Sequence, residues 1–192
     1  NTTFNLNRSV GAGGALYLRG CSTTDNAQLV RCGGGDATHY ASLNNVTMIG
    51  NTDQNDQVSA IAGALAIIDG NGNWEFKMAN SVVAANTDYQ GNPSNCMATP
   101  LSSKLATLGN NRLGTTTDHA SNGAIAQCDF LLPASDVVDP TYNVLANIGV
   151  DAINFAGGDY VMTPQLTSPL HDRGALPTAM VGPCEFDDQL GV

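Results

Sequence analysis

The chain has 192 residues, of which 12% are charged, and its 17 acidic against 7 basic side chains give a net charge of −10. This charge lacks the basic footprint that nucleic acid requires and disfavours an anionic membrane surface, so we expect neither as a partner. Hydrophobic residues make up 42% of the chain but occur in short runs, none near the ~18 residues of a transmembrane helix. We therefore expect a folded core and no direct insertion into a membrane.

Three stretches repeat one pattern, in which an asparagine stands at each end of seven residues. They are residues 1–7, 45–51 and 80–86, which start 44 and 35 residues apart. Similar glycine-rich stretches, 13–18 and 62–67, follow the first two. Self-similarity of this kind is typical of a solenoid, and low charge with abundant Asn, Thr and Gly favours strands joined by tight turns. We predict an all-β parallel β-helix as a single domain.

The repeat divides the N-terminal half into turns of the solenoid, which we call coils. Coil one covers residues 1–44, with strands predicted at 2–6, 12–18 and 39–43, and coil two covers 45–79, with strands at 46–50, 62–68 and 74–78. Coil three opens with a strand at 81–85. Phe4, Met48 and Val83 hold the same place in the repeat, so we expect them to stack inside as an apolar ladder. Leu16 and Leu65 should stack in the same way on another sheet.

The regularity fades after Asn86. Strand-like pieces follow at 104–108, 112–113, 124–126, 130–132, 143–148 and 160–162, and six prolines punctuate the sequence from Pro133 to Pro183. We predict regular coils over residues 1–89, then irregular final coils and a capping tail over 90–192.

The terminal asparagines of the repeat have a structural interpretation. Asparagine tolerates the left-handed backbone of tight turns, and equivalent amides of stacked coils can bond each other along the axis. We predict two such ladders, formed by Asn1, Asn45 and Asn80 and by Asn7, Asn51 and Asn86. Asn1, Asn7 and Asn45 also match glycosylation sequons, which is the alternative function for these positions.

The five cysteines form no Cys-x-x-Cys or Cys/His cluster, so no zinc site is predicted. Cys21 and Cys32 bracket the polar stretch 22–31 and are predicted to form a disulfide, which fits an oxidising, extracellular setting. For Cys184 three possibilities remain open: a buried free thiol, a partner outside this segment, or a partner in another chain.

Asp69, Asn71 and Asn73 place oxygen ligands at alternate positions, as calcium loops do. The loop lacks a glycine at its sixth position and a glutamate at its twelfth, and a plain turn between Ile68 and Trp74 is the alternative. The acidic group at 185–188 is a weaker candidate. Calcium is the one cofactor the sequence raises.

At this point the chain resembles a known family. Residues 1–7 followed by 13–18 are similar to the Asn-Ser-Thr-Phe-x-x-Asn and Gly-Gly-Ala-Ile-Tyr units of bacterial secreted right-handed parallel β-helix proteins, large cell-surface proteins related to the polymorphic outer-membrane protein repeats. Residues 80–88 resemble that family's last regular strand, and residues 96, 108–114, 128–130, 139–140, 168–174 and 184–191 resemble its ordered closing elements. His171 and Leu190 depart from that pattern, since an apolar residue and an arginine are usual there.

The resemblance implies right-handed coils, a secreted, cell-surface location and a disulfide between Cys96 and Cys128. Because the family's N-terminal signature is missing, it also implies that this is the C-terminal part of a longer chain. It implies no reaction.

Parallel β-helices include polygalacturonases and pectate lyases, so an enzyme is the first alternative. The stretches 51–53 and 86–88 both read Asn-Thr-Asp, as in polygalacturonases, but the Gly-His-Gly and Arg-Ile-Lys motifs are missing. An inverting glycosidase needs two carboxylates spaced around a water, and the adjacent pair Asp187–Asp188 belongs to the closing element. A lyase base such as Lys77 or Arg112 lies in no recognisable site, so no catalytic residue is predicted.

These features favour a non-enzymatic structural or adhesive segment of a secreted bacterial surface protein. The alternatives are a polysaccharide lyase or hydrolase, and a subunit of an extracellular fibre built by end-to-end stacking. The sequence opens inside a repeat, so the strands at 2–6 and 12–18 would present open edges. We expect other β-helix coils or subunits to cover that end, with a surface glycan or protein as a further partner.

The cysteine assignments yield a testable prediction. Peptide mapping of the non-reduced protein should recover Cys21 joined to Cys32, on account of the loop they bracket, and Cys96 joined to Cys128, on account of the resemblance. Either cysteine of a pair found joined elsewhere would overturn that pairing.

Overall fold

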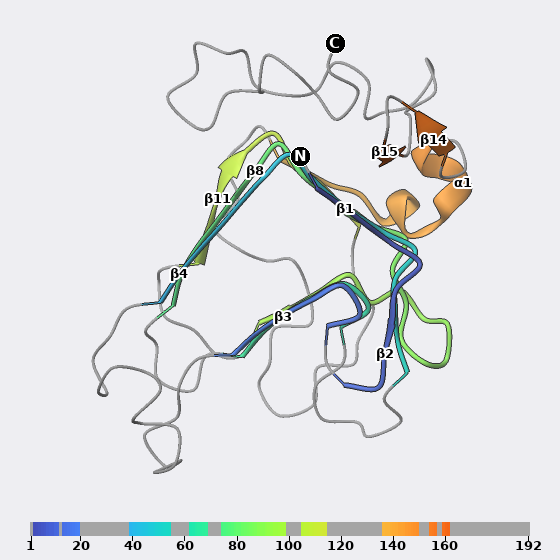
Figure 1. The fold of residues 1–192 in the computed structure, drawn as a ribbon, viewed down its shortest axis with the longest axis horizontal. Coiled ribbons are helices and arrows are strands. Elements are labelled where there is room, and N and C mark those ends of the chain that lie inside the picture. Colours follow the sequence, from blue (N-terminus) through green and yellow to red (C-terminus); the bar gives the residue numbers. More distant parts are fainter. Residues whose placement is uncertain are drawn as a thin grey trace.

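A computed structural model describes residues 2–11, 13–19, 39–54, 62–68, 74–98, 105–114, 136–149, 154–156 and 159–161. The described part is mainly β, with small parallel sheets stacked in register, consistent with a parallel β-solenoid. Seen along the stack, the sheets that begin with β1, β3 and β4 lie on three sides of a central core (Figure 1).

The elements follow one another coil by coil. Coil one holds β1 (Thr2–Asn5), β2 (Arg8–Ser9), β3 (Leu16–Arg19) and β4 (His39–Asn44). Coil two repeats the order with β5 (Val46–Ile49), β6 (Thr52–Asp53), β7 (Leu65–Ile68) and β8 (Trp74–Ala79). Coil three holds β9 (Val82–Ala84), β10 (Cys96–Ala98) and β11 (Leu105–Gly109), and later strands are β12 (Arg112–Leu113) and β13 (Val137–Val138).

Each strand pairs with its counterpart in the next coil. The sheets have the orders β1-β5-β9-β12-β13, β3-β7-β10, β4-β8-β11 and β2-β6, and every pairing in them is parallel. The strands β14 (Asn154–Ala156) and β15 (Asp159–Val161) form a separate antiparallel pair. The seven strands predicted for coils one to three are therefore present in the described ranges, whereas the short β2–β6 sheet was not predicted.

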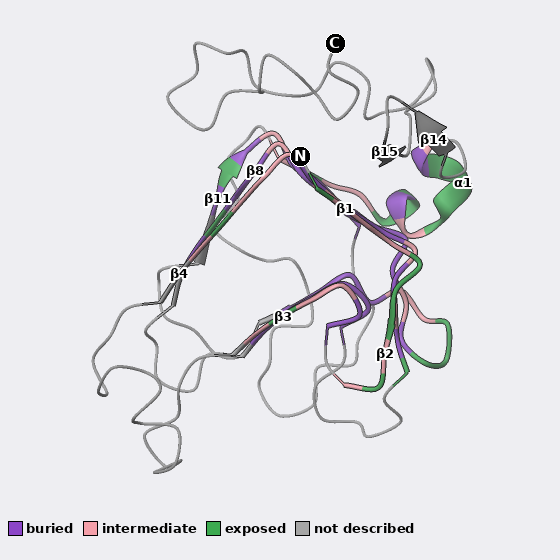
Figure 2. Cartoon of the chain, in the orientation of Figure 1, coloured by how far each residue is buried: buried purple, intermediate pink, exposed green. Residues whose placement is uncertain are grey.

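The predicted apolar ladder is confirmed. Phe4 pairs with Met48, Met48 with Val83, and Val83 with Leu113 across the five-stranded sheet. Met48, Val83 and Leu113 are fully buried, and Phe4 on the first coil is half-buried. Figure 2 shows buried stretches in purple along the stacked strands. On another sheet Leu16 aligns with Leu65, as predicted.

The glycine-rich stretches correct two strand boundaries, since the strand predicted at 62–68 begins only at Leu65. The strand predicted at 12–18 begins only at Leu16, because Gly13 adopts a left-handed backbone and Gly14 lies against the backbone of the next coil. In coil two a Cβ on Gly63 would lie 2.5 Å from both the N and O atoms of Thr87. Glycine therefore lets two chain segments approach each other at this corner.

The strand predicted at 143–148 is wrong, because this segment is helical. A 3-10 helix, η1 (Pro140–Asn143), leads into a short α-helix, α1 (Leu145–Ile148). Asp139 caps the start: its Oδ1 accepts the Thr141 N–H at 2.8 Å and the Thr141 hydroxyl at 2.7 Å. These bonds from the Thr141 side chain and backbone hold the pKa of the exposed Asp139 carboxyl below its ordinary value.

The helical segment lies against the outer face of the five-stranded sheet. Tyr142 and Ile148 form an apolar cluster with Ile49, Ala84 and Ala85, distinct from the central core. The apolar residues of this segment are therefore spaced to pack one side of a helical segment against the sheet, and they do not alternate as in a strand.

The apolar ladder yields a stability prediction. Met48→Asp would place a charge between Phe4 and Val83 and should lower the free energy of unfolding by about 3–5 kcal/mol. Thr47→Asp is the matched control, since the half-buried Thr47 is the neighbouring residue of the same strand and faces away from the core. Denaturant unfolding should show a much smaller loss for the control; equal losses would contradict the register.

Candidate functional site

In the described part of the chain, a row of asparagine side chains lies along one corner of the coils, and we call it the asparagine ladder. Its members are Asn7, Asn51, Asn86, Asn95 and Asn143. Each side-chain Nδ2 donates to the Oδ1 of the next member, at 3.0, 2.9, 3.0 and 2.8 Å in that order. The structure thus brings together three predicted residues, Asn7, Asn51 and Asn86, and adds two more.

The amide-to-amide bonds of the ladder all run in one direction, from each asparagine to the next one along the chain. The backbone N–H of Asn7 donates to Asn51 Oδ1 at 3.0 Å, and that of Asn51 donates to Asn86 Oδ1 at 2.9 Å. The side chains also reach back to the preceding coil, since Asn51 Nδ2 donates to the Phe4 carbonyl at 3.1 Å. Asn86 Nδ2 does the same to the Met48 carbonyl at 2.9 Å. Only an amide of this length combines the acceptor and the donors that these bonds need.

Burial makes the ladder energetically consequential. Asn51, Asn86 and Asn95 are completely buried, whereas Asn7 on the first coil is exposed. A buried amide that loses a hydrogen bond costs about 1–3 kcal/mol, so each inner member depends on the members on both sides.

The residue before each of the three repeat asparagines, Asn7, Asn51 and Asn86, turns the corner with a left-handed backbone. The values of φ are 54° at Leu6, 70° at Gly50 and 51° at Ala85. The conserved geometry at three different residue types indicates that the amide bonds of the ladder, and not the turn residue, hold this corner in shape.

Asn95 enters the ladder through a short hairpin-like excursion, only nine residues after Asn86. Asp88 organises this excursion by accepting the N–H groups of Gln90 and Asn92 at 2.8 Å each, and the Asn92 side-chain amide at 2.9 Å. Asn95 aligns with no asparagine of the repeat, which is why its role could not be read from the spacing.

The second predicted ladder has a different form. Asn1 lies outside the described residues, and Asn45 and Asn80 occupy left-handed turns with φ of 54° and 49°. Asn80 Nδ2 donates to Asn44 Oδ1 at 2.9 Å. Asparagine's tolerance of this backbone accounts for the residue type at both turns.

The stacked acceptors at this corner are instead the residues one position later. The backbone N–H of Val46 donates to Ser81 Oγ at 3.1 Å, and the backbone N–H of Ser81 donates to Asn111 Oδ1 at 3.0 Å. The backbone N–H of Asn111 in turn donates to Asp136 Oδ1 at 2.8 Å. This row of Ser81, Asn111 and Asp136, which we call the mixed ladder, was not predicted because its members are chemically different.

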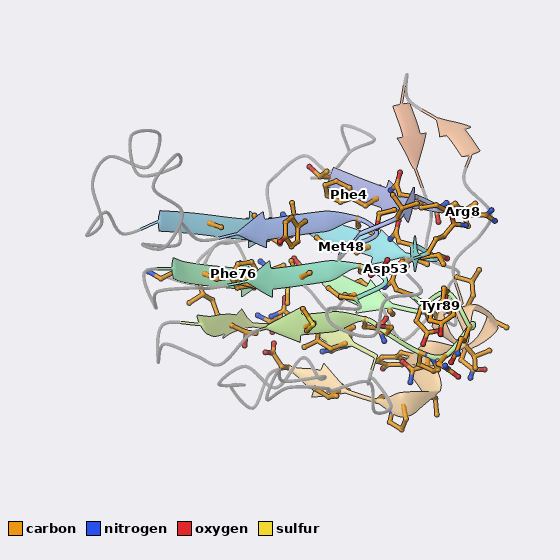
Figure 3. The ribbon with its side chains drawn as sticks, turned by 90° about the horizontal axis from the view of Figure 1, so that it is seen from below. Phe4, Arg8, Met48, Asp53, Phe76 and Tyr89 are labelled. Carbon is orange, nitrogen blue, oxygen red and sulfur yellow. The ribbon has the colours of Figure 1, made fainter. Side chains whose placement is uncertain are left out.

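The two Asn-Thr-Asp motifs lie side by side in the stack. Thr52 pairs with Thr87, and the hydroxyls of the two residues are 3.2 Å apart. Asp53 and Asp88, which follow them, are 0% and 1% exposed, and Figure 3 shows Asp53 within the coil corner. Neither carboxylate is presented to solvent, and that of Asp88 accepts N–H groups of its own turn.

The candidate lyase bases do not join these carboxylates. Arg112, in β12, is 9% exposed and its Nη1 donates to the Asn111 carbonyl at 3.0 Å. Lys77 is exposed in β8, on a different sheet. The structure therefore distributes these side chains over separate parts of the solenoid.

Several candidate residues lie outside the described part of the chain. They are the calcium candidates Asp69, Asn71 and Asn73, the acidic group at 185–188, and Cys21, Cys32, Cys128 and Cys184. Cys96 lies buried in β10 and is disulfide-bonded, but the predicted pairing with Cys128 involves a residue that is not described. In the described ranges, no three His, Cys, Asp or Glu side chains group together as a metal site would need. Those ranges also include no helix with the length and apolar character needed to cross a membrane.

No family model, curated protein or solved structure matches the chain.

The asparagine ladder yields a prediction with a pH dependence. Asn86→Asp keeps the shape but places a carboxylate against the Met48 and Asn95 oxygens, so at pH 7 it should lower the free energy of unfolding by roughly 3–5 kcal/mol. Burial and these acceptors raise the folded-state pKa of the new carboxyl above its unfolded value. The loss relative to wild type should therefore be full above the folded pKa and shrink as pH falls toward about 4.

Asn7→Asp is the control, because Asn7 is the exposed member of the same ladder. Unfolding of both variants and the wild type should be compared at each pH. A loss at Asn86 that matches the control, or that does not change with pH, would contradict the structural role of the buried amide.

Proposed function

We propose that this chain is a non-enzymatic structural or adhesive segment of a secreted bacterial cell-surface protein, a right-handed β-helix with irregular final coils and a capping tail. The observation that carries the proposal is the asparagine ladder, which ties successive coils by side-chain and backbone bonds at completely buried positions. A stack fixed in this way transmits its register from coil to coil and makes a stiff spacer.

The polar side chains of the inner corners support the same role. Asn51, Asn86 and Ser81 direct their groups at neighbouring coils, and Asp88 directs its carboxylate at its own turn. Chemistry on a substrate would need groups directed at solvent instead.

The outer surface suits contact with a glycan or a protein. Tyr17 on β3 and Tyr89 at the turn after Asp88 are 45% and 41% exposed. Figure 3 shows Arg8 and Tyr89 on the same side of the stacked strands. Exposed tyrosines offer a flat apolar face and a hydroxyl, and such side chains are enriched where proteins meet their ligands.

The proposal predicts the outcome of activity assays. The purified chain should release neither unsaturated nor reducing products from pectin, alginate or related polyanions. Turnover that disappears in Asp53→Asn or Arg112→Gln, with the fold retained by circular dichroism, would establish a polysaccharide lyase or hydrolase instead. Arg8→Gln, at the exposed β2 position, is the control for a nonspecific loss of charge.

A further inference from the structure

The turn after Asn86 holds an exposed tyrosine in place through its neighbours. Tyr89 is 41% exposed, and its hydroxyl oxygen accepts Gln90 Nε2 at 2.8 Å. Gln90 Oε1 accepts Asn92 Nδ2 at 3.2 Å, and the same Nδ2 donates to Asp88 Oδ2 at 2.9 Å. A chain of hydrogen bonds therefore connects the buried carboxylate of Asp88 to the exposed hydroxyl of Tyr89.

The base of this turn is built into the asparagine ladder. Asn86 and Asn95 flank the turn and are completely buried, and the Ser94 N–H donates to the Asn86 carbonyl at 2.8 Å. Bonds between exposed side chains add little to stability, and ordering those side chains costs conformational entropy. An ordered, exposed tip on a fixed base is therefore better explained as a surface preorganised for a ligand than as a stabilising element.

The exposed part of the tip carries no charge. Its one carboxylate belongs to Asp88, which is 1% exposed and accepts the N–H groups of Gln90 and Asn92 and the side-chain amide of Asn92. The exposed residues Tyr89, Gln90 and Gly91 offer a phenol, an amide and backbone groups. The net charge of −10 on the chain disfavours a polyanion, and the tip presents no carboxylate to a polycation. A neutral ligand suits this surface.

The shape and the donor of the tip select the class of neutral ligand. The Tyr89 ring is a flat apolar face, and because its oxygen already accepts Gln90, its hydroxyl hydrogen is left to donate outward. A pyranose ring with equatorial hydroxyls is complementary, since it has C–H groups on its faces and hydroxyl oxygens around its edge. Tyr17 on β3 is 45% exposed, but among the described residues no side chain bonds its hydroxyl.

We propose that the turn formed by residues 88–92 binds a neutral β-linked glucan, with one glucose ring stacked on Tyr89. The Tyr89 hydroxyl donates to a hydroxyl oxygen at the edge of that ring, and Gln90 is the positioning residue that holds the tyrosine for it. The β linkage keeps the chain extended, so that a ring within it can still lie flat on an aromatic face. The inference rests on the proposed adhesive role and names the class of glycan that the segment contacts.

The experiment uses the full chain, isotope-labelled for NMR, with cellohexaose as the probe. Maltohexaose has the same glucose units in α linkage and controls for linkage, and hexagalacturonate controls for charge. The variants are Tyr89→Ala, Tyr89→Phe, Gln90→Ala and the double variant of the last two. Tyr17→Ala is the matched control, because Tyr17 is an exposed tyrosine on β3. All the changed side chains are exposed, so the fold should be retained, and the amide spectra verify it.

We expect cellohexaose to shift the Tyr89 ring and the amides of residues 89–92. Tyr89→Ala should weaken this binding at least about tenfold. Tyr89→Phe should weaken it about fivefold, since the ring stays and the donor is lost. Gln90→Ala should weaken it about threefold in the wild type and bring no further loss in the Tyr89→Phe background, because Gln90 acts through the Tyr89 hydroxyl. Tyr17→Ala should leave the binding unchanged.

No binding of cellohexaose, equal binding of maltohexaose or hexagalacturonate, or shifts that survive in Tyr89→Ala would overturn the proposal. A further loss from Gln90→Ala in the Tyr89→Phe background would overturn the positioning role of Gln90. These outcomes are separate from those of the activity assays. Turnover of pectin or alginate would refute the structural or adhesive role whatever the glucan does, whereas failure of cellohexaose to bind would refute this site and leave the assay results to stand.

Discussion

A buried primary amide must find a partner for its oxygen and for its N–H groups, and the rest of this structure depends on how that requirement is met. Asn51 and Asn86 are fully buried, and each meets it only when the coils before and after stand directly above and below it. Sliding one coil by a single residue would break these bonds and would also turn Met48 away from the core. The amide ladder and the apolar ladder therefore enforce the same register, and an error in either is opposed by both.

This constraint explains why the coils tolerate such different lengths. Successive ladder members are separated by 44, 35, 9 and 48 residues along the chain, yet the amide-to-amide distances stay between 2.8 and 3.0 Å. The extra residues form loops whose two ends are fixed at the corners of the coils. The entropic cost of closing such a loop grows only slowly with its length. Shortening an excursion is equally acceptable provided that it returns an asparagine to the corner, as the turn around Asp88 returns Asn95.

The parts of the fold that could be predicted are those in which the repeat shows the contact partners directly. Asn7, Asn51 and Asn86, like Phe4, Met48 and Val83, hold equal places in the repeat, so their stacking follows from a parallel arrangement alone. Such an inference needs no knowledge of the intervening loops.

The unpredicted parts lack that internal comparison. Asn95 and Asn143 join the ladder from irregular segments, and the mixed ladder changes residue type at every step. The sequence predicts a strand where the helix after Asp139 lies, because the Asp-Pro pair resembles the closing element and the apolar residues that follow suit either period. The candidate site is predictable to the same extent. Its ladder follows from the repeat, whereas the burial of Asp53 and Asp88 is visible only once the corner is packed in the structure.

The direction of the ladder gives the two ends of the stack different chemistry. On the far side Asn143 Oδ1 already accepts the Asn95 amide, and Tyr142 supplies its carbonyl to the Ala85 N–H at 2.9 Å, so a non-repetitive segment occupies the positions that another coil would use. On the near side Asn7 presents an acceptor. Two near sides placed against each other would bring two such acceptors together, with no donor between them, and would set the strands antiparallel. Stacking through this ladder is therefore directional, because each asparagine donates to the next one, and a symmetric pairing of two coil-one edges is disfavoured by the same hydrogen bonds that hold the coils together.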